Sequence, residues 1–327
     1  MSGVQTRSVS DRDADMRLDR WFHQYFPGLG FGRLQKLLRT GQIRVDGRRA
    51  KAGQRLNAGQ NIRIPPLNDR PSADGPERPG VSAKDAAFVR GLVLHMDDDV
   101  IAVNKPAGLA VQGGTRTTRH LDGLLDALRF DQEERPRLVH RLDRDTSGVM
   151  LLARHRVAAN QLGQVFRSRN ARKLYWAVTV GVPAPEQGTI KIPLSKGGGA
   201  GRERAFQDAK AGKRAITLFK VLDKAGTKVA WLVLWPQTGR THQLRVHMAG
   251  IGTPILGDGK YGGQNAFVDH PEIERQLHLH ARELVVPHPG TGRDFRFVAP
   301  LPAHMEQTFA HYGFEPAEGL MDPFPRD

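Results

Sequence analysis

The sequence predicts an α+β protein in which a small α/β module precedes a main domain built on a mixed, largely antiparallel sheet. At 327 residues, the chain is long enough for two domains of this kind. Strand-like apolar runs and helical segments alternate irregularly after residue 89, which disfavours a doubly wound parallel sheet. A proline-rich stretch separates that region from a compact basic segment near the N-terminus, with Pro65, Pro66, Pro71, Pro76 and Pro79.

We expect five segments along the chain. Residues 1–14 alternate charged and small side chains without an apolar period, which is typical of a flexible leader. The α/β module spans residues 15–66, a linker spans 67–88, the main domain spans 89–312, and 313–327 form a loose tail.

The module is predicted to contain two helices and two short strands. Leu18, Trp21, Phe22 and Tyr25 recur at helical spacing, and a second helix is expected over residues 32–40. Gly41 stands where a glycine commonly ends a helix. Strands are expected at 43–45 and 61–64, with a tight Asp46–Gly47 turn after the first.

The main domain is predicted to be rich in strands. Helices are expected at residues 121–128 and 158–166. Apolar and β-branched runs predict strands at residues 93–95, 100–103, 175–180, 215–221 and 229–235.

Composition restricts the classes of partner. The chain has 49 Lys and Arg against 34 Asp and Glu, a net charge of +15, which favours a polyanion such as nucleic acid over the alternative of an anionic membrane surface. No run reaches the ~20 apolar residues of a membrane span, and the N-terminus lacks the apolar core of a secretory signal. The absence of cysteine excludes disulfides and thiolate metal sites and fits a cytoplasmic protein.

Residues 140–148, which read HRLDRDTSG, form the most informative segment. Asp143 lies between Arg141 and Arg144, and flanking guanidiniums favour an ionised carboxylate. Such a group suits nucleophilic attack better than proton donation. Arginine forks also match phosphate oxygens, which indicates chemistry on a nucleic acid. From these nine residues alone, a structural acid in an arginine ladder is the simplest interpretation.

Other chemical readings fit the sequence less well. No second Asp-Thr-Ser-Gly segment supplies the paired carboxylates of an aspartic protease, and the downstream residues of a kinase catalytic loop are missing. The glycine-rich residues 197–201 lack the ending of a P-loop and are expected to form a loop. His278 and His280 alternate on a predicted strand without further ligands at zinc spacing.

The module itself is strongly basic. It holds eleven Lys or Arg and three acids, a net charge of +8, which suits binding to the shape of structured RNA. Residues 41–47 (GQIRVDG) and 59–64 (GQNIRI) resemble the S4 RNA-binding module, which follows a basic helix in the same way. The alternative is a solvated basic face. The resemblance implies RNA contacts from Arg33, Lys36, Arg39 and Arg44.

Four further segments accompany residues 140–148 in a fixed order. They are NKPAGL at 104–109, RKLYWA at 172–177, PQTGRTHQLRVH at 236–247 and PILGD at 254–258. Together they resemble the RluA family of RNA pseudouridine synthases over roughly residues 90–300, and an S4 module ahead of that catalytic domain is a frequent layout of the family. Residues 105–114 resemble the branch that modifies large-subunit ribosomal RNA, except that Gln112 replaces an expected histidine.

This resemblance implies a role for each motif residue. Asp143 would be the nucleophile, Tyr175 would stack on the uracil and take its C5 proton, and Arg245 would be the counter-ion of Asp143. Arg240 is the second choice for the counter-ion and otherwise a phosphate ligand. Arg141 would help to flip the uridine out of the RNA. Arg144 and Lys105 are also expected to contact RNA, although Arg144 could equally be structural.

The expected activity is isomerisation of uridine to pseudouridine in structured RNA, most simply 23S ribosomal RNA or a large-subunit assembly intermediate. The carboxylate could add to C6, attack C1′ or remove the 2′ proton, and the sequence leaves these routes open. We expect no cofactor, no metal and no membrane partner, and a monomer. A non-catalytic RNA-binding protein and a hydrolase are the competing classes; a glycosidase normally needs two separately placed carboxylates.

Overall fold

The structure is a computed structural model that describes residues 3–67, 80–113, 117–168, 170–197, 204–316 and 323–324. The chain divides into two compact units, Met1–Gly80 and Val81–Asp327. Within the described residues, none of the helices combines the length and apolarity needed to cross a membrane. The predicted glycine-rich loop at 197–201 lies outside the described residues except for Gly197.

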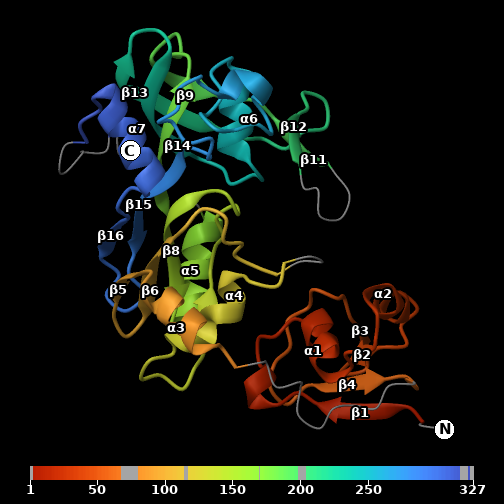
Figure 1. The fold of residues 1–327 in the computed structure, drawn as a ribbon. Coiled ribbons are helices and arrows are strands. Elements are labelled where there is room, and N and C mark those ends of the chain that lie inside the picture. Colours follow the sequence, from red (N-terminus) through yellow and green to blue (C-terminus); the bar gives the residue numbers. More distant parts are fainter. Residues whose placement is uncertain are drawn as a thin grey trace. The chain divides into compact units, whose positions relative to one another are not determined.

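The first unit packs two helices against a four-stranded antiparallel sheet (Figure 1). The strand order is β1-β4-β2-β3, and the elements are β1 (Gln5–Ser8), α1 (Leu18–Tyr25), α2 (Phe31–Arg39), β2 (Arg44–Val45), β3 (Arg48–Arg49) and β4 (Asn61–Ile64). Both predicted helices and both predicted strands are present, each within one residue of the expected bounds.

The sequence signals of this unit act as expected. Leu34, Leu37 and Leu38 of α2 are buried in the core of the unit. Gly41 follows the helix at φ +71°, and Asp46 and Gly47, both with positive φ, form the two-residue turn between β2 and β3.

The prediction of a flexible leader over residues 1–14 is wrong. Residues 5–8 form β1, which pairs along its whole length with β4, and Val9 is buried next to it. β1 is an edge strand, and its side chains are mostly exposed. Because main-chain hydrogen bonds to β4 hold it in place, its sequence lacks the alternation of apolar and polar residues that would predict a strand. The Arg7 guanidinium also lies 3.9 Å from the centre of the Tyr25 ring.

The second unit is built on a ten-stranded mixed sheet, which confirms the predicted fold class. Its main order is β10-β13-β14-β9-β15-β8-β6-β5, with β16 on β15 and β7 on β8. The strands are β5 (Val93–Met96), β6 (Val100–Lys105), β7 (Arg137–Leu138), β8 (Ser147–Ala153), β9 (Arg172–Val180), β10 (Gln187–Ile190), β13 (Thr217–Ala225), β14 (Val229–Pro236), β15 (Leu279–Pro287) and β16 (Asp294–Val298). A separate hairpin consists of β11 (Leu194–Gly197) and β12 (Arg204–Gln207).

Helices cover both faces of this sheet (Figure 1). Around β6 and β8, one face packs on α5 (Arg156–Ser168) and the other on α3 (Ala83–Arg90), α4 (Leu121–Leu124) and the 3-10 turn Leu125–Leu128. Around β9 and β14, one face packs on α6 (Gln243–Gly250) and the other on α7 (Ala303–Tyr312). Tyr175 and Trp176 therefore face opposite sides of β9.

The two halves of the sheet meet at the β8–β15 junction. Ser147 pairs with His280 and Gly148 with Ala281, and this is the one parallel pairing among the named strands in the described chain. A single row of neighbours crosses the sheet here, namely Lys105, Gly148, Ala281, Tyr175 and Leu234. The row brings the start of β8 close to Tyr175.

Two other boundaries predicted from the sequence are wrong. The expected linker over 67–88 includes most of α3, whose N-terminus is capped by the Ser82 hydroxyl accepting from the Asp85 N–H at 3.1 Å. The expected loose tail contains Phe314 and Phe324, which are buried against the core beneath α7. Proline content nearby, and the scarcity of apolar residues in these segments, hid both features.

Candidate active site

The loop that carries Asp143 is fixed by the residues on either side of it. His140 is half-buried, its Nε2 accepts from the Leu151 N–H at 2.9 Å, and its ring stacks on Phe166. Burial lowers the pKa of His140 to about 3, with a further contribution from the Lys173 charge, so the ring stays a neutral acceptor. Leu142 is buried, whereas the Asp143 side chain remains 25% exposed.

Gly148 allows this loop to enter the sheet. Its φ is +117°, and a Cβ at this position would lie 2.2 Å from the Ala281 carbonyl oxygen. A side chain would therefore push β15 away from β8. The glycine of the HRLDRDTSG segment is explained by this close approach.

Lys105 holds two loops together from inside the protein. Its side chain is fully buried, and Nζ donates to the carbonyl oxygens of Pro106 at 2.9 Å, Leu109 at 2.9 Å and Arg144 at 3.1 Å. Burial lowers its pKa to about 8, opposed by the charges of Asp145 and Asp143. The prediction that Lys105 contacts RNA is therefore wrong, because its ammonium is enclosed and its three donors are used.

Arg144 joins the same two loops at the surface. Its Nε donates to the Gly108 carbonyl at 3.0 Å, and the Gly108 N–H donates to the Arg144 carbonyl at 2.9 Å. Two roles were expected for Arg144, an RNA contact and a structural role. These hydrogen bonds support the structural role. The main chain of the Asp143 loop is thus fixed from the end of β6.

The segment 236–247 is organised by two buried polar side chains. The Thr238 hydroxyl donates to Gln243 Oε1 at 2.7 Å and accepts from the Ile216 N–H at 2.9 Å. Gln243 Nε2 donates to the Ile216 carbonyl at 2.9 Å and the Thr217 hydroxyl at 3.0 Å. These bonds tie the start of α6 to β13 and determine where Arg245 and His242 lie.

Arg245 is buried and makes a two-pronged ion pair with Asp258. Nε to Oδ2 is 2.9 Å and Nη2 to Oδ1 is 2.6 Å. Its remaining nitrogen, Nη1, lies 3.9 Å from Asp145 Oδ2. The expectation that Arg245 is the direct counter-ion of Asp143 needs correction: its contacts are Asp258 and Asp145, and Asp143 affects it only through its charge.

Sequence reasoning missed His242, whose imidazole lies next to the Asp143 carboxylate. His242 Nε2 is 4.0 Å from Asp143 Oδ2, and the residue has φ 51° at the N-terminal end of α6. Its Nδ1 lies 2.6 Å from the Tyr261 hydroxyl, which accepts from the Ala205 N–H at 3.0 Å. A Tyr261 hydroxyl that donates to Nδ1 would place the ring proton on Nε2, which faces Asp143.

Asp258 and Tyr261 are the other positioning residues that the sequence did not single out as functional. Asp258 belongs to the PILGD segment, and the preceding Gly257 has φ +80°. A Cβ on Gly257 would collide with the Gln276 carbonyl at 1.7 Å. A histidine with positive φ cannot be recognised from one sequence, and neither can its tyrosine partner nineteen residues later.

Tyr175 is half-buried beside Asp143. Burial and then the negative charge of Asp143 raise the pKa of its phenol well above the usual range. The phenol is therefore neutral at physiological pH. This favours an aromatic contact with a base over a phenolate that removes a proton.

The remaining sequence candidates occupy distinct environments. His278 and His280 are buried, and burial lowers the pKa of each to about 4. They bond to Gln276, Thr308, Ser147 and Ala299, so they are neutral core residues. Arg141 and Arg240 are exposed near the site, and Arg240 Nε donates to the Arg214 carbonyl at 3.2 Å.

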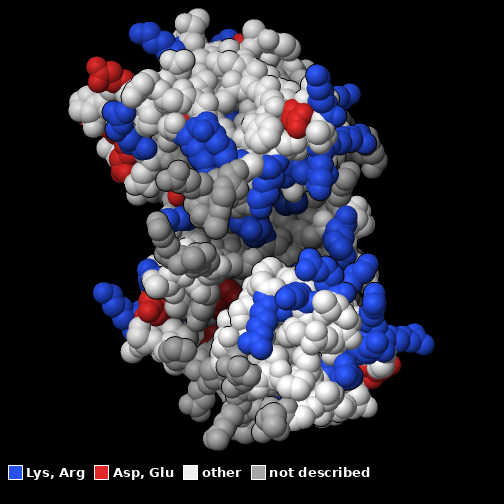
Figure 2. Space-filling model, turned by 90° about the vertical axis from the view of Figure 1, so that its right-hand side faces the viewer, with Lys and Arg blue, Asp and Glu red and all other residues white. Residues whose placement is uncertain are grey.

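The basic residues of the first unit lie on its surface. Arg33, Lys36 and Arg39 form the exposed side of α2, and Arg44 lies on β2 with its guanidinium donating to the Gly41 and Gly47 carbonyls. Lys and Arg outnumber acidic residues on the face shown in Figure 2.

Potential metal ligands lie away from Asp143. The described residues contain two groups of three such side chains, His270 with Glu272 and His311, and Asp97 with Asp99 and His288. Neither group includes a residue of the Asp143 or Arg245 segments.

Lys105→Met should lower the free energy of unfolding by roughly 2–4 kcal/mol, because three inward carbonyl oxygens lose their donor. Chemical denaturation of the full chain measures this change. Lys84→Met, at an exposed position on α3, is the matched control and should have little effect.

The same variant should also change the pH dependence of stability. Because burial lowers the pKa of Lys105 from 10.5 to about 8, the unfolded chain binds more protons between these values. This lysine therefore makes the wild-type protein more stable as the pH rises through that window, and the variant should lack this gain. Equal stability profiles for the two proteins would refute the buried role.

Comparison with known proteins gives a consistent family match. Residues 99–250 match the RNA pseudouridylate synthase family. The ribosomal large subunit pseudouridine synthase C of Vibrio cholerae is 33% identical over 308 residues, 93% of this chain and 95% of the relative. The protein of the same name from Salmonella typhimurium is 34% identical over 304 residues, 91% of this chain and 93% of the relative.

A solved structure gives the same result. Human RNA Pseudouridylate Synthase Domain Containing 4 aligns with a TM-score of 0.61 and 30% identity, over 72% of this chain and 99% of that one. Sequence identity at this level over nearly the whole chain shows common descent, and the motif order is that of the RluA group. The chain therefore belongs to the RNA pseudouridine synthases, in the RluA family and similar to its large-subunit synthase C members.

Proposed function

We propose that this enzyme isomerises specific uridines in large-subunit ribosomal RNA, with Asp143 as its nucleophile. The observation that carries the proposal is one partly exposed carboxylate that lies 4.0 Å from His242 Nε2 and whose charge acts on the Tyr175 phenol. The large-subunit substrate is supported by the names of the two bacterial relatives and by the net charge of +15.

The reaction breaks one bond and forms another at the same sugar carbon. The C1′–N1 bond is cleaved, the uracil rotates, C5 bonds to C1′, the C5 proton leaves and N1 takes up a proton, so the atoms balance without an oxidant or reductant. Addition to C6, attack on C1′ and removal of the 2′ proton all require an ionised carboxylate. Asp143 can serve any of the three routes.

The surroundings distinguish Asp143 from Asp145. Asp145 is more exposed, with 57% of its side chain accessible, and it lies 3.9 Å from Arg245 Nη1. Asp143 is 25% exposed and its charge acts directly on Tyr175. A partly dry carboxylate next to an aromatic ring suits covalent chemistry on a base.

The other side chains would receive the uridine. Tyr175 would stack on the uracil as a neutral phenol, because its raised pKa makes it a poor general base at neutral pH. Arg141, exposed beside the nucleophile, would stabilise the flipped nucleotide, since a guanidinium stacks on bases and binds phosphate. Arg240 and Arg144 would lie within reach of the RNA backbone.

Asp143→Asn should abolish pseudouridine formation while leaving RNA affinity nearly unchanged, because the amide keeps the shape but cannot attack. Tritium release from C5-labelled ribosomal RNA measures the activity, and filter binding measures affinity. Asp145→Asn is the matched control and should retain most of the activity. Activity that survives in Asp143→Asn and disappears in Asp145→Asn would identify the other aspartate.

Tyr261→Phe should reduce kcat by about tenfold, the equivalent of one hydrogen bond, with KM for RNA unchanged. The phenylalanine keeps the ring but removes the hydroxyl that lies 2.6 Å from His242 Nδ1, so the orientation and tautomer of the imidazole that faces Asp143 are no longer fixed. His242→Ala should show the same split between kcat and KM. An altered pH profile of kcat is expected as well; a change in KM alone would assign the pair to RNA binding.

We also propose that the first unit is an S4-type RNA-binding module. The triple replacement of Arg33, Lys36 and Arg39 by Gln should weaken RNA binding and make the dependence of log K on log salt shallower by up to about 2–3. Replacing Arg12, Arg20 and Lys51 removes the same charge from other exposed positions of the unit and is the control. Equal slopes for the two triple variants would show an effect of net charge and not of the α2 face.

A further inference from the structure

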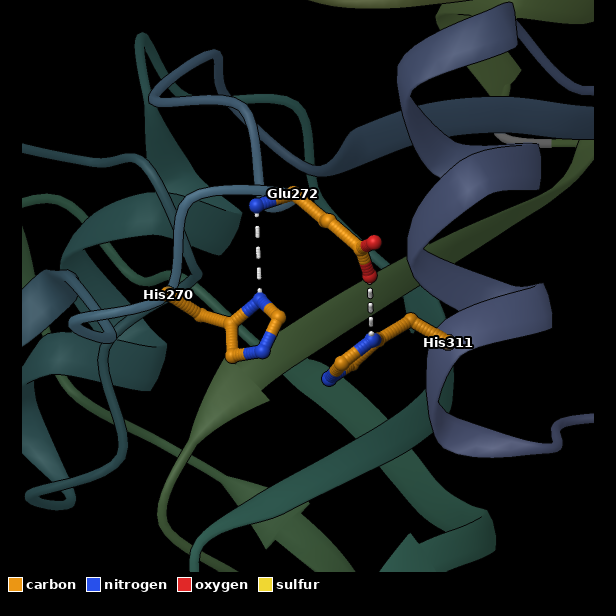
Figure 3. A group of neighbouring side chains, drawn as sticks. All are labelled: His270, Glu272 and His311. Atoms are coloured by element: carbon orange, nitrogen blue, oxygen red, sulfur yellow. Dashed lines mark hydrogen bonds and ion pairs between the residues drawn. The ribbon is translucent and has the colours of Figure 1, made fainter.

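A cluster of two histidines and a glutamate lies on the opposite face of the sheet from Tyr175. His270 and Glu272 belong to the loop that precedes β15, and His311 lies in the last turn of α7 (Figure 3). α7 packs on Trp176 and Trp231 through Met305 and Phe309, on the face away from the proposed active site. The cluster therefore belongs to no step proposed above.

Glu272 orients both imidazole rings. Its carboxylate accepts from His311 Nδ1 at 3.1 Å, and its backbone N–H donates to His270 Nδ1 at 3.3 Å (Figure 3). The two ring centres are 4.1 Å apart. A ring that donates through Nδ1 to a carboxylate presents the Nε2 lone pair outward, which is the usual arrangement of a histidine that binds a metal.

The two Nε2 atoms have no hydrogen-bond partner within the described part of the chain, and Figure 3 shows them on the sides of the rings that face one another. One potential ligand atom from each of the three residues lies within 4.8 Å of the others. His311 is 25% exposed and Glu272 64% exposed at the side chain, so both can adjust to the 2.0–2.2 Å bonds typical of zinc.

The second group of potential ligands differs in this respect. Asp97 Oδ2 already contacts His288 Nε2 at 3.1 Å and His95 Nε2 at 2.8 Å, and Asp97 Oδ1 accepts two backbone N–H groups. His288 Nδ1 accepts from the Gly290 N–H. The polar atoms of this second group are hydrogen-bonded to one another and to neighbouring residues. We therefore interpret the group as a structural network.

We propose that His270, Glu272 and His311 form a binding site for a divalent transition metal ion of the zinc type. Two imidazole nitrogens and one carboxylate, with water completing a tetrahedron, are a donor set that zinc commonly takes. Ligation through His270 Nε2 moves its ring proton to Nδ1 and gives up the 3.3 Å contact with the Glu272 N–H. Because a carboxylate bonded to His311 Nδ1 cannot reach an ion on Nε2 of the same ring, the exposed Glu272 side chain would also leave Nδ1 when it binds the ion. The ion would clamp the end of α7 to the loop before β15 and stabilise the unit without entering catalysis.

The test is calorimetric titration of the EDTA-treated full chain with ZnCl₂, followed by thermal unfolding with and without the ion. We expect one equivalent to bind and to raise the unfolding temperature of the second unit. His270→Ala and His311→Ala should each weaken binding by more than about tenfold. Both residues lie at the surface, so these variants should fold. His23→Ala, an exposed histidine on α1, is the matched control and should bind as the wild type does.

Three results would overturn the proposal. They are the absence of saturable binding near one equivalent, wild-type affinity in the His270→Ala, His311→Ala double variant, and loss of binding in Asp99→Asn while both histidine variants still bind. Pseudouridine formation by the metal-free chain and by His311→Ala is expected to match the wild type. An inactive wild-type enzyme would therefore count against the proposed function and not against this site.

Discussion

The proposed active site depends on the short parallel pairing between β8 and β15. Ser147 and Gly148 on one strand meet His280 and Ala281 on the other, and this junction joins the half of the sheet that carries Lys105 to the half that carries Tyr175. Only glycine fits at position 148, because a Cβ would lie 2.2 Å from the facing carbonyl. The Asp143 loop ends at this glycine, so the distance between Asp143 and Tyr175 is set by backbone pairing and not by flexible side chains.

Around this junction, the acidic side chains contact different basic partners. The two aspartates of the loop lie two residues apart but meet different partners, His242 for Asp143 and Arg245 for Asp145. Arg245 is almost fully buried, and Asp258 compensates its charge with two hydrogen bonds. That pairing keeps a guanidinium in place without drawing Asp143 into a tight ion pair, and it leaves the proposed nucleophile accessible to a substrate.

The sequence predicted the features that are encoded locally. Buried leucines on α2 and the Asp46–Gly47 turn each follow from residues close in the chain. The sequence did not predict which residues the buried polar groups contact. Lys105 and Arg144 are thirty-nine residues apart, and His242 and Asp143 still farther. An edge strand such as β1, which is held by main-chain bonds, likewise leaves no signature in side-chain pattern.

Lys105 shows why the residue type matters as well as the charge. Three carbonyl oxygens, from Pro106, Leu109 and Arg144, converge on one ammonium group at 2.9–3.1 Å. An ammonium offers three donors around a single nitrogen, whereas a guanidinium spreads five donors across a plane. Arginine at this position could not satisfy the three oxygens from one point and would need more room in a closed space. The lysine of the NKPAGL segment is therefore a positioning group, and its charge, opposite to that of Asp143 and Asp145, offsets part of the cost of burying it.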